Sequence, residues 1–173
     1  MTALDHAKKE GPEDLIVMQE KTKSGDHLLE ACVSFFETDA WPFERVKELP
    51  MVRSRYNGRN GQYACWFQVR PGEKQLMFYS RSPIIAPEDR RQAMALFFTL
   101  ANYSMVIGNF ELDLSDGEMR YKVSIDAEEI ELTHTFLKNF SYTAVLTMDR
   151  YLPGIMKVLA GIDPWEAIKE SEG

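Results

Sequence analysis

The sequence predicts an α+β protein in which helices pack on an antiparallel sheet of about five strands. Three observations indicate this class: an amphipathic stripe near the N-terminus, two groups of strand-like runs bounded by turn-forming residues, and a long helical stripe before the C-terminus. The expected order is α-β-β-β-α-β-β-α. Composition is that of a globular protein, 45% hydrophobic and 27% charged, which excludes collagen-like, coiled-coil and fully disordered chains.

The first helix and the strands after it follow from spacing and turn residues. Asp26 is suited to cap a helix whose apolar positions are spaced i, i+3, i+4, i+7 and i+11, namely Leu29, Cys32, Val33, Phe36 and Ala40. The Trp41-Pro42 pair ends that helix. Strand-like runs follow at about 50–56, 62–70 and 75–82, and the segments between them are rich in turn formers. We therefore expect a three-stranded antiparallel meander.

The register of this meander gives it two different faces. If residues 71–74 form the second loop, Phe67 lies opposite Phe78 on one face, and Trp66 lies opposite Tyr79 on the other. Both faces are then partly apolar.

Three further helices are expected. Pro87 opens one that runs to about Met105, because proline at the first helical position needs no N–H. Apolar residues from 137 to 159 advance by three or four, which is the period of a helix lying on a sheet. Pro153 should kink or interrupt that helix. Asp163 caps a short last helix.

A hairpin is expected between the second and third helices, over residues 110–125. Pairing Leu114 with Met119 puts alternating apolar residues on its buried face. The same register places opposite charges together on the outer face, with Asp113 opposite Arg120 and Glu111 opposite Lys122.

The domain organisation is simple. Residues 1–24 are expected to form a loosely held tail in which only Ile16, Val17 and Met18 contact the core. Residues 25–162 are expected to form a single α+β domain, and residues 163–173 a short C-terminal helix. The chain shows neither a secretory signal nor an apolar run near the roughly 18 residues of a membrane span, so we expect a cytoplasmic protein without a membrane partner.

Charge is unevenly distributed along the chain. The formal net charge is −7, which argues against a general DNA-binding protein, because phosphate binding needs a basic surface. Residues 45–91, however, hold ten Lys or Arg and four acids, a net charge of +6, and the remaining residues carry −13.

Motifs for catalysis, metals and cofactors are absent from the sequence. The two cysteines, Cys32 and Cys65, occupy apolar helix and strand positions and are expected to be buried. The three histidines lack zinc-ligand spacing, and the glycine-rich segment 57–61 is better explained as a hairpin turn than as a phosphate loop. We expect no cofactor, no metal and no enzyme activity.

The most informative set of residues lies on the second face of the meander. Alternation along the strands brings together aromatic, methionine and arginine side chains, the types enriched at protein interfaces: Arg53, Arg55, Trp66, Arg70, Met77, Tyr79 and Arg81. We interpret this face as a surface for a partner protein or a second copy of the chain.

Other interpretations of this face and of the chain stay open. A helix of the same chain would cover the face if it belonged to the core. Single-stranded nucleic acid would stack its bases on Trp66 and Tyr79. Alternatively, an enzyme site would combine residues distant in sequence, such as His134, Asp149 and Arg150.

The sequence resembles the YbjN-domain family of bacterial proteins. The resemblance covers roughly residues 26–160 and is carried by the element order, by Gly108-Asn109-Phe110-Glu111, by the hairpin ending in Arg120-Tyr121 and by the segment 148–153. It implies a fold like the type III secretion chaperones, homodimers, and loose links to bacterial stress and motility regulation. It implies no catalytic residues.

Overall fold

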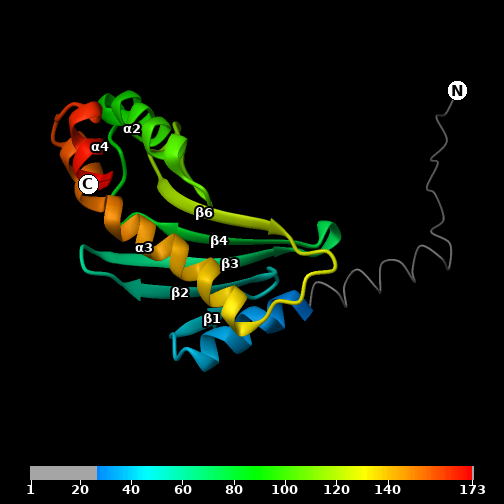
Figure 1. Cartoon of the computed structure of the whole chain (residues 1–173). Coiled ribbons are helices and arrows are strands. Elements are labelled where there is room, and N and C mark those ends of the chain that lie inside the picture. The colour runs from blue at the N-terminus through cyan, green and yellow to red at the C-terminus, as the bar shows by residue number, and fades with distance from the viewer. Residues whose placement is uncertain (1–26, 173) are drawn as a thin grey trace, which may run out of the picture.

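The computed structural model describes residues 27–172, and in it six antiparallel strands form one sheet in the order β1-β2-β3-β4-β6-β5 (Figure 1). The strands are β1 (Phe43–Arg45), β2 (Met51–Asn57), β3 (Gln62–Arg70), β4 (Gln75–Arg81), β5 (Asn109–Leu112) and β6 (Met119–Asp126). The α+β class and the antiparallel sheet are confirmed. The expected tail over residues 1–24, with Ile16–Met18, and the cap at Asp26 lie outside the described residues.

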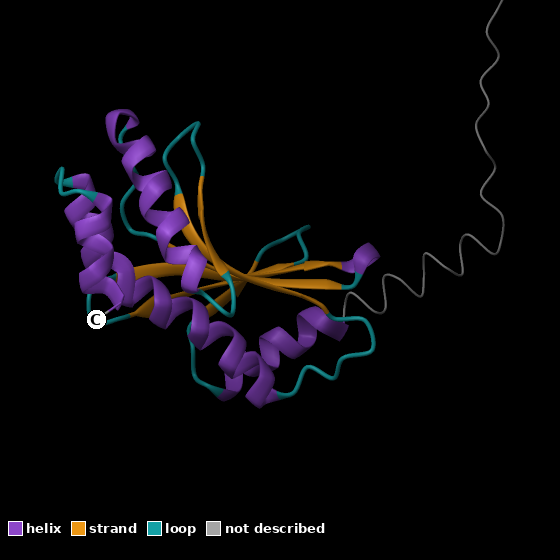
Figure 2. Ribbon diagram, turned by 45° about the horizontal axis from the view of Figure 1, so that its top comes forward, coloured by secondary structure: helices purple, strands orange, loops and turns teal. Residues whose placement is uncertain are grey.

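Four α-helices and two 3-10 turns complete the described chain. A helix spans residues 27–38, and the others are α2 (Arg91–Ser104), α3 (His134–Leu159) and α4 (Pro164–Glu172), with 3-10 turns η1 (Pro71–Glu73) and η2 (Glu88–Arg90). In Figures 1 and 2, α3 and the helix over residues 27–38 lie along the same face of the sheet. Within the described residues, no helix is long and apolar enough to cross a membrane.

The predicted register of the meander is confirmed. Phe67 pairs with Phe78 and Trp66 pairs with Tyr79. Side chains of the two pairs point to opposite faces, because strand residues alternate. Phe67 and Phe78 are fully buried under the helices, with ring centroids 4.6 Å apart.

The structure contains a strand that the sequence analysis missed. β1 pairs with β2 over three residues, Phe43 with Ser54 and Arg45 with Val52 among them. The segment follows Trp41-Pro42 and has no alternating pattern long enough to be recognised as a strand. Its pairing depends on the partner strand, and the Ser54 hydroxyl donates to the carbonyl oxygen of Pro42 at 2.8 Å.

The predicted register of the β5–β6 hairpin is wrong by two residues. Leu112, not Leu114, pairs with Met119, and Glu111 pairs with Arg120. The reason lies in the turn, where the carboxylate of Asp113 accepts hydrogen bonds from the backbone N–H and hydroxyl of Ser115, at 2.8 and 2.6 Å. Asp113 is thus used as a turn residue rather than as a partner of Arg120. A shift of two preserves the faces, so the apolar side remains buried.

The second helix begins later than expected, because Pro87 has extended backbone and a 3-10 turn intervenes before α2. Asp163 does cap α4, since its Oδ1 accepts from the N–H of Trp165 at 2.9 Å. Of the two effects expected of Pro153, the interruption is wrong, because α3 continues through it, and the kink stays a prediction.

Proline 153 is accommodated because the β2–β3 turn supplies the missing hydrogen bond. Pro153 has no N–H for the carbonyl oxygen of Asp149, four residues earlier. The side-chain amide of Asn60 donates to that oxygen instead, at 2.8 Å. The Asp149 carboxylate also accepts from Tyr63 Oη at 2.7 Å and from the backbone N–H groups of Asn60 and Arg59 at 2.8 and 3.0 Å. This cluster fastens the glycine-rich turn to α3, which confirms its structural role.

Neither edge of the sheet offers a long free strand. On β5, the side-chain amide of Asn102 bonds both backbone groups of Phe110, accepting from its N–H at 2.7 Å and donating to its carbonyl oxygen at 3.1 Å. The amide thereby occupies the positions a neighbouring strand would use. The opposite edge is β1, which is only three residues long.

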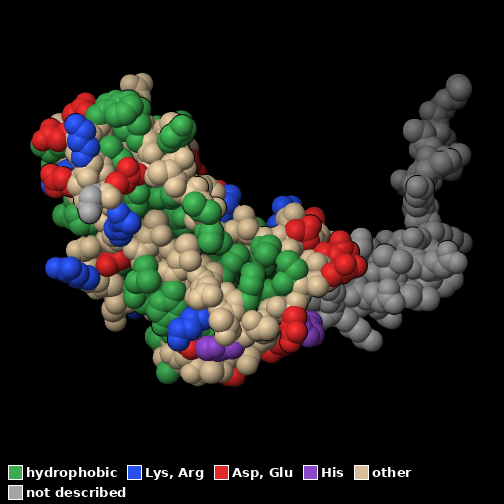
Figure 3. All heavy atoms as spheres, viewed as in Figure 1, with side chains coloured by type: hydrophobic (Ala, Val, Ile, Leu, Met, Phe, Trp, Pro, Cys, Tyr) green, Lys and Arg blue, Asp and Glu red, His purple; other side chains and the backbone are tan. Residues whose placement is uncertain are grey.

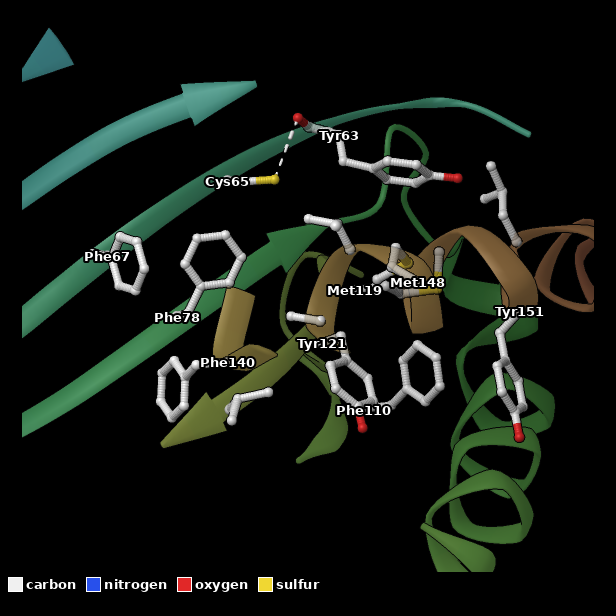
Figure 4. Close-up of a cluster of buried hydrophobic side chains, with 14 of the residues drawn as sticks. Tyr63, Cys65, Phe67, Phe78, Phe110, Met119, Tyr121, Phe140, Met148 and Tyr151 are labelled. Atoms are coloured by element: carbon white, nitrogen blue, oxygen red, sulfur yellow. Dashed lines mark hydrogen bonds between the residues drawn. The ribbon is translucent and has the colours of Figure 1, made fainter. Parts of the chain in front are cut away.

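The core lies between the sheet and the helices and is rich in aromatic rings (Figure 4). Phe110, for example, stacks on Phe98 with ring centroids 4.6 Å apart and meets Tyr121 edge to face at 4.9 Å. Cys32 and Cys65 belong to this core and are at most 1% exposed, so their expected burial is confirmed.

Both thiols are therefore expected to be unreactive in the folded protein. Burial raises the pKa of Cys65 to about 12 and raises the pKa of Cys32 still further, and the thiolate is the reactive form. A thiol-reactive dye at mildly alkaline pH should label neither cysteine in buffer and both in denaturant. Rapid labelling of one cysteine in buffer would contradict the packing described here.

Candidate protein-binding surface

The face of the sheet opposite the helices, here called the open face, is built from alternate residues of β2, β3, β4 and β6. It includes Arg53, Arg55, Ala64, Trp66, Gln68, Arg70, Met77, Tyr79, Arg81, Arg120, Lys122 and Asp126. All seven residues that the sequence analysis proposed for a partner surface lie on it, because strand parity is retained from β2 to β4.

Two rows of Cα partners cross the open face. One row contains Arg53, Trp66, Tyr79 and Lys122, and the other contains Arg55, Ala64, Arg81 and Arg120. Alanine 64 is the smallest side chain in either row. A hollow of about 870 Å³ lies over this region, lined by residues from β1 to β6 that include Arg55, Ala64 and Trp66.

Three flat groups stack at the centre of the open face. The rings of Trp66 and Tyr79 are nearly parallel, with centroids 5.0 Å apart and an interplanar angle of 22°. On the other side of Tyr79, the guanidinium carbon of Arg120 lies 4.6 Å from the ring centroid. Tyr79 is consequently only 7% exposed, although none of the described helices covers it. Such stacking and cation–π contacts hold the side chains in fixed positions.

An ion network fixes Arg120 over the tyrosine. Its Nε donates to Glu111 at 2.7 Å, and Lys122 donates to the other oxygen of the same carboxylate. Burial by itself would raise the pKa of Glu111, but the hydrogen bonds from Lys122 and Arg120 outweigh it and lower the pKa. Glu118 pairs with Arg81 at 3.4 Å and with Arg120 at 3.7 Å. Each cation on the β4–β6 side is therefore ion-paired within the chain.

The arginines on the β2 side differ from these. Arg53 and Arg55 are exposed, and neither takes part in an ion pair with any described residue. Arg53 stands beside Trp66 and Arg55 beside Ala64. Arg70 lies at the far end of β3, where it pairs with Glu73 at 3.8 Å.

No helix within residues 27–172 covers the open face, so none of the described helices buries it in the core. Trp66 is partly exposed, and its one ring neighbour among the described residues is Tyr79. The helices reach the sheet through the other face, where Phe67 contacts Phe35 and Phe36 with centroids 6.0 and 5.2 Å apart.

The enzyme site considered from sequence is not assembled. His134 and Asp149 both lie on α3, fifteen residues apart, which is about 22 Å along a helix at about 1.5 Å per residue. His134 bonds Asp39 at 2.7 Å, and Asp149 is occupied by the β2–β3 turn. Arg150 donates to the carbonyl oxygen of Ser171 in α4. Among residues 27–172 there is also no group of side chains suited to hold a metal ion.

Sequence reasoning missed the part of the open face contributed by β6. Alternation of Arg120 and Lys122 with buried Met119, Tyr121 and Val123 shows that they point away from the core. It does not show which strand β6 adjoins, because the chain crosses over through α2 between β4 and β5. The structure places β6 beside β4 and so brings Arg120 onto Tyr79.

The protein is of the α+β class, with an antiparallel sheet that carries helices on one face. Its other face presents arginine and aromatic side chains. The chain belongs to the YbjN family, whose model, described as "Putative bacterial sensory transduction regulator", matches residues 30–156. The resemblance drawn from the sequence is thereby confirmed. No protein with a curated description matches the chain.

Two solved structures are similar to this chain. One is a chain of the "Crystal Structure of the ExsC-ExsE Complex", with 13% identity over 72% of this chain and 92% of that chain and a TM-score of 0.47. The other is a chain of the "Structure of the HopA1-SchA Chaperone-Effector Complex", with 16% identity over 68% of this chain and 85% of that chain and a TM-score of 0.46.

Proposed function

We propose that this chain is a non-enzymatic protein-binding protein, a chaperone-like or regulatory adaptor, and that the open face holds its partner. The observation that carries the proposal is the stack of Trp66, Tyr79 and Arg120 on a sheet face that no described helix covers. Tryptophan, tyrosine and arginine contribute most to binding at protein interfaces. Because these side chains are already held by stacking, less side-chain entropy is lost when a partner binds.

A protein partner is favoured over nucleic acid by the acids on the same surface. Glu111 and Glu118 lie among the cations of the open face, and Glu44 is the Cα partner of Arg53. A phosphate backbone carries charge continuously and would meet these carboxylates. A polypeptide can place its charges selectively. The description of the YbjN family names a regulator rather than an enzyme class, which also supports the proposal.

The proposal includes a homodimer and a cytoplasmic location. Two free cysteines are typical of a reducing compartment. Two surfaces are candidates for holding a second copy: the open face, and the C-terminal end of α2, in the part of the molecule where Figure 3 shows hydrophobic side chains at the surface. At that end, Tyr103 is 94% exposed and Val106 is 96% exposed. Exposed apolar surface of this kind is typical of interaction sites.

Light scattering after size exclusion tests the dimer. We expect the wild-type mass to be about twice 19.9 kDa. If the dimer forms through the open face, Trp66→Glu should dissociate it, because the substitution buries a charge at the centre of the interface. Trp165→Glu is the matched control, since Trp165 is 58% exposed and lies on α4. If Val106→Glu dissociates the dimer and Trp66→Glu does not, the second copy binds at the end of α2. A monomeric wild-type protein contradicts the dimer.

Affinity capture from the native cell tests the partner. Wild-type protein and Trp165→Glu should enrich the same partner, and Trp66→Glu should lose it while keeping the wild-type thermal stability. Equal enrichment by all three proteins would contradict the assignment of the open face as the binding surface.

A further inference from the structure

We propose that the segment held by the open face is extended and acidic, with carboxylates at alternate positions that bind Arg53 and Arg55. This inference rests on the proposed function and states the chemistry of the partner. It follows from charge, spacing and shape on the β2 side of the face.

The charge argument concerns which cations already have partners. Arg81, Arg120 and Lys122 are each paired with Glu111 or Glu118. Among the described residues no carboxylate forms an ion pair with Arg53 or Arg55, although Glu44 is the Cα partner of Arg53. An exposed guanidinium next to an aromatic ring forms strong, geometrically defined bonds with a carboxylate, because two N–H groups match its two oxygens. Both guanidiniums are therefore free to bind carboxylates supplied by a partner.

The spacing argument concerns strand geometry. Arg53 and Arg55 are alternate residues of β2 and point to the same side, roughly 6.6 Å apart along the strand. An extended peptide repeats its same-side residues at the same interval. Two acidic side chains separated by one residue in an extended peptide can therefore each bind one guanidinium, with both the peptide and β2 remaining extended.

The shape argument concerns the floor of the hollow. Ala64 stands between Arg55 and Arg81 as the Cα partner of both. Its small side chain leaves room for a carboxylate beside the guanidinium of Arg55, next to the pair that Arg81 forms with Glu118. Beside Arg53, the partly exposed indole of Trp66 provides an apolar surface for the methylene groups of the neighbouring acidic side chain.

A second copy of the chain is a less suitable occupant of this site. A twofold interface places the same patch against itself, and because Glu111 and Glu118 are already paired within each copy, two patches with an excess of cations would meet. Like charges brought together without counter-ions oppose binding. An acidic segment of a different protein removes that repulsion.

Fluorescence anisotropy tests the inference with a short labelled peptide in which glutamate alternates with threonine. We expect the glutamate peptide to bind at least about tenfold more tightly than the same peptide with glutamine, because each paired carboxylate contributes charge-assisted hydrogen bonds. Arg53→Glu and Arg55→Glu should each weaken binding about tenfold. Arg59→Glu is the matched control: Arg59 is exposed in the β2–β3 turn, and its substitution changes the net charge equally.

A charge-reversed peptide guards against loss of folding. A peptide in which lysine alternates with threonine should bind the Arg53→Glu, Arg55→Glu double variant more tightly than it binds the wild-type protein. An unfolded variant gives no such rescue. High salt should weaken the wild-type complex with the glutamate peptide, because the contacts are exposed.

Several outcomes would overturn the inference. These are equal binding of the glutamate and glutamine peptides, equal loss in Arg59→Glu, tighter binding of a single-stranded oligonucleotide than of the glutamate peptide, or a dimer that Arg53→Glu and Trp66→Glu both dissociate. If acidic peptides fail while Trp66→Glu still loses the captured partner, the inference fails and the proposed function stands. If Trp66→Glu keeps every partner, both fail.

Discussion

Replacement of Asp149 by alanine is expected to lower the free energy of unfolding by about 3 kcal/mol, because it leaves buried donors without an acceptor. The carboxylate accepts from the Tyr63 hydroxyl and from the backbone N–H groups of Arg59 and Asn60. The bond from Tyr63 is buried, and the bonds from the two backbone N–H groups are partly buried. Urea unfolding followed by circular dichroism measures the loss.

Two companion variants locate the effect. Asp89→Ala removes an exposed aspartate that pairs only with its neighbour Arg90 at 3.5 Å, and should change stability by less than about 0.5 kcal/mol. Tyr63→Phe removes one of the donors and should cost about 1 kcal/mol. A loss in Asp149→Ala no greater than that in Asp89→Ala would show that the cluster does not hold the turn on the helix.

The contribution of Asp149 also depends on pH. Burial by itself would raise the pKa of this carboxyl, but the hydrogen bonds from Tyr63 and from the backbone N–H groups of Asn60, Arg59 and Gly61 outweigh it and lower the pKa. An unfolded aspartate titrates near about 3.9. The stabilisation is therefore fully present above that pH and is lost as the pH falls through the lower folded-state value. The stability difference between wild type and Asp149→Ala should shrink in acid, and a constant difference would contradict this assignment.

Replacement of Gly117 by alanine is expected to cost about 3 kcal/mol, for two reasons that act together. Gly117 has a φ of +83°, a backbone conformation that residues other than glycine rarely adopt. A Cβ atom at this position would lie 2.0 Å from the carbonyl oxygen of Ala86, which is backbone and cannot turn aside. The Ala86 N–H also donates to the Gly117 carbonyl oxygen at 2.8 Å. Removing the steric clash therefore requires the segment before α2 to separate from the hairpin.

Gly72→Ala is the control for this substitution. Gly72 is exposed in the turn between β3 and β4, and a Cβ atom there would meet nothing within 4 Å. Its replacement should change stability by less than about 1 kcal/mol, in either direction. Equal midpoints of thermal unfolding for Gly117→Ala and Gly72→Ala would show that the hairpin and the segment around Ala86 are not in close contact.

The meander and its open face could be predicted from the sequence because both depend on local rules. Turn residues at 71–74 set the β3–β4 register, and alternation then assigns Phe67 to the core and Trp66 to the other face. Because side chains alternate along a strand, the face assigned to one residue fixes the faces of all the others. The seven proposed surface residues therefore share a face as expected.

The errors occurred where a side-chain hydrogen bond overrides the pattern, within the turn at Asp113 and between distant segments at Pro153. At Asp113, the side chain serves the turn instead of pairing with Arg120, so the β5–β6 register moves by two. At Pro153, the local rule predicts a kink or break, but Asn60 from the β2–β3 turn satisfies the orphaned carbonyl oxygen of Asp149. In both cases a side-chain hydrogen bond decides the outcome. The periodicity of the sequence does not indicate the partner in that bond.

The sequence by itself determined the class of fold, the register of the central meander, the burial of both cysteines and the composition of the open face. Each of these depends on side-chain periodicity and on turn residues, which act over short distances along the chain. Only the tertiary structure decided that β6 lies beside β4, that Arg120 stacks on Tyr79 and that Arg53 and Arg55 form no ion pair among the described residues. These features depend on which strands the α2 crossover brings together. Hydrophobic alternation shows which face of a strand is buried, but it does not show which strand lies next to it.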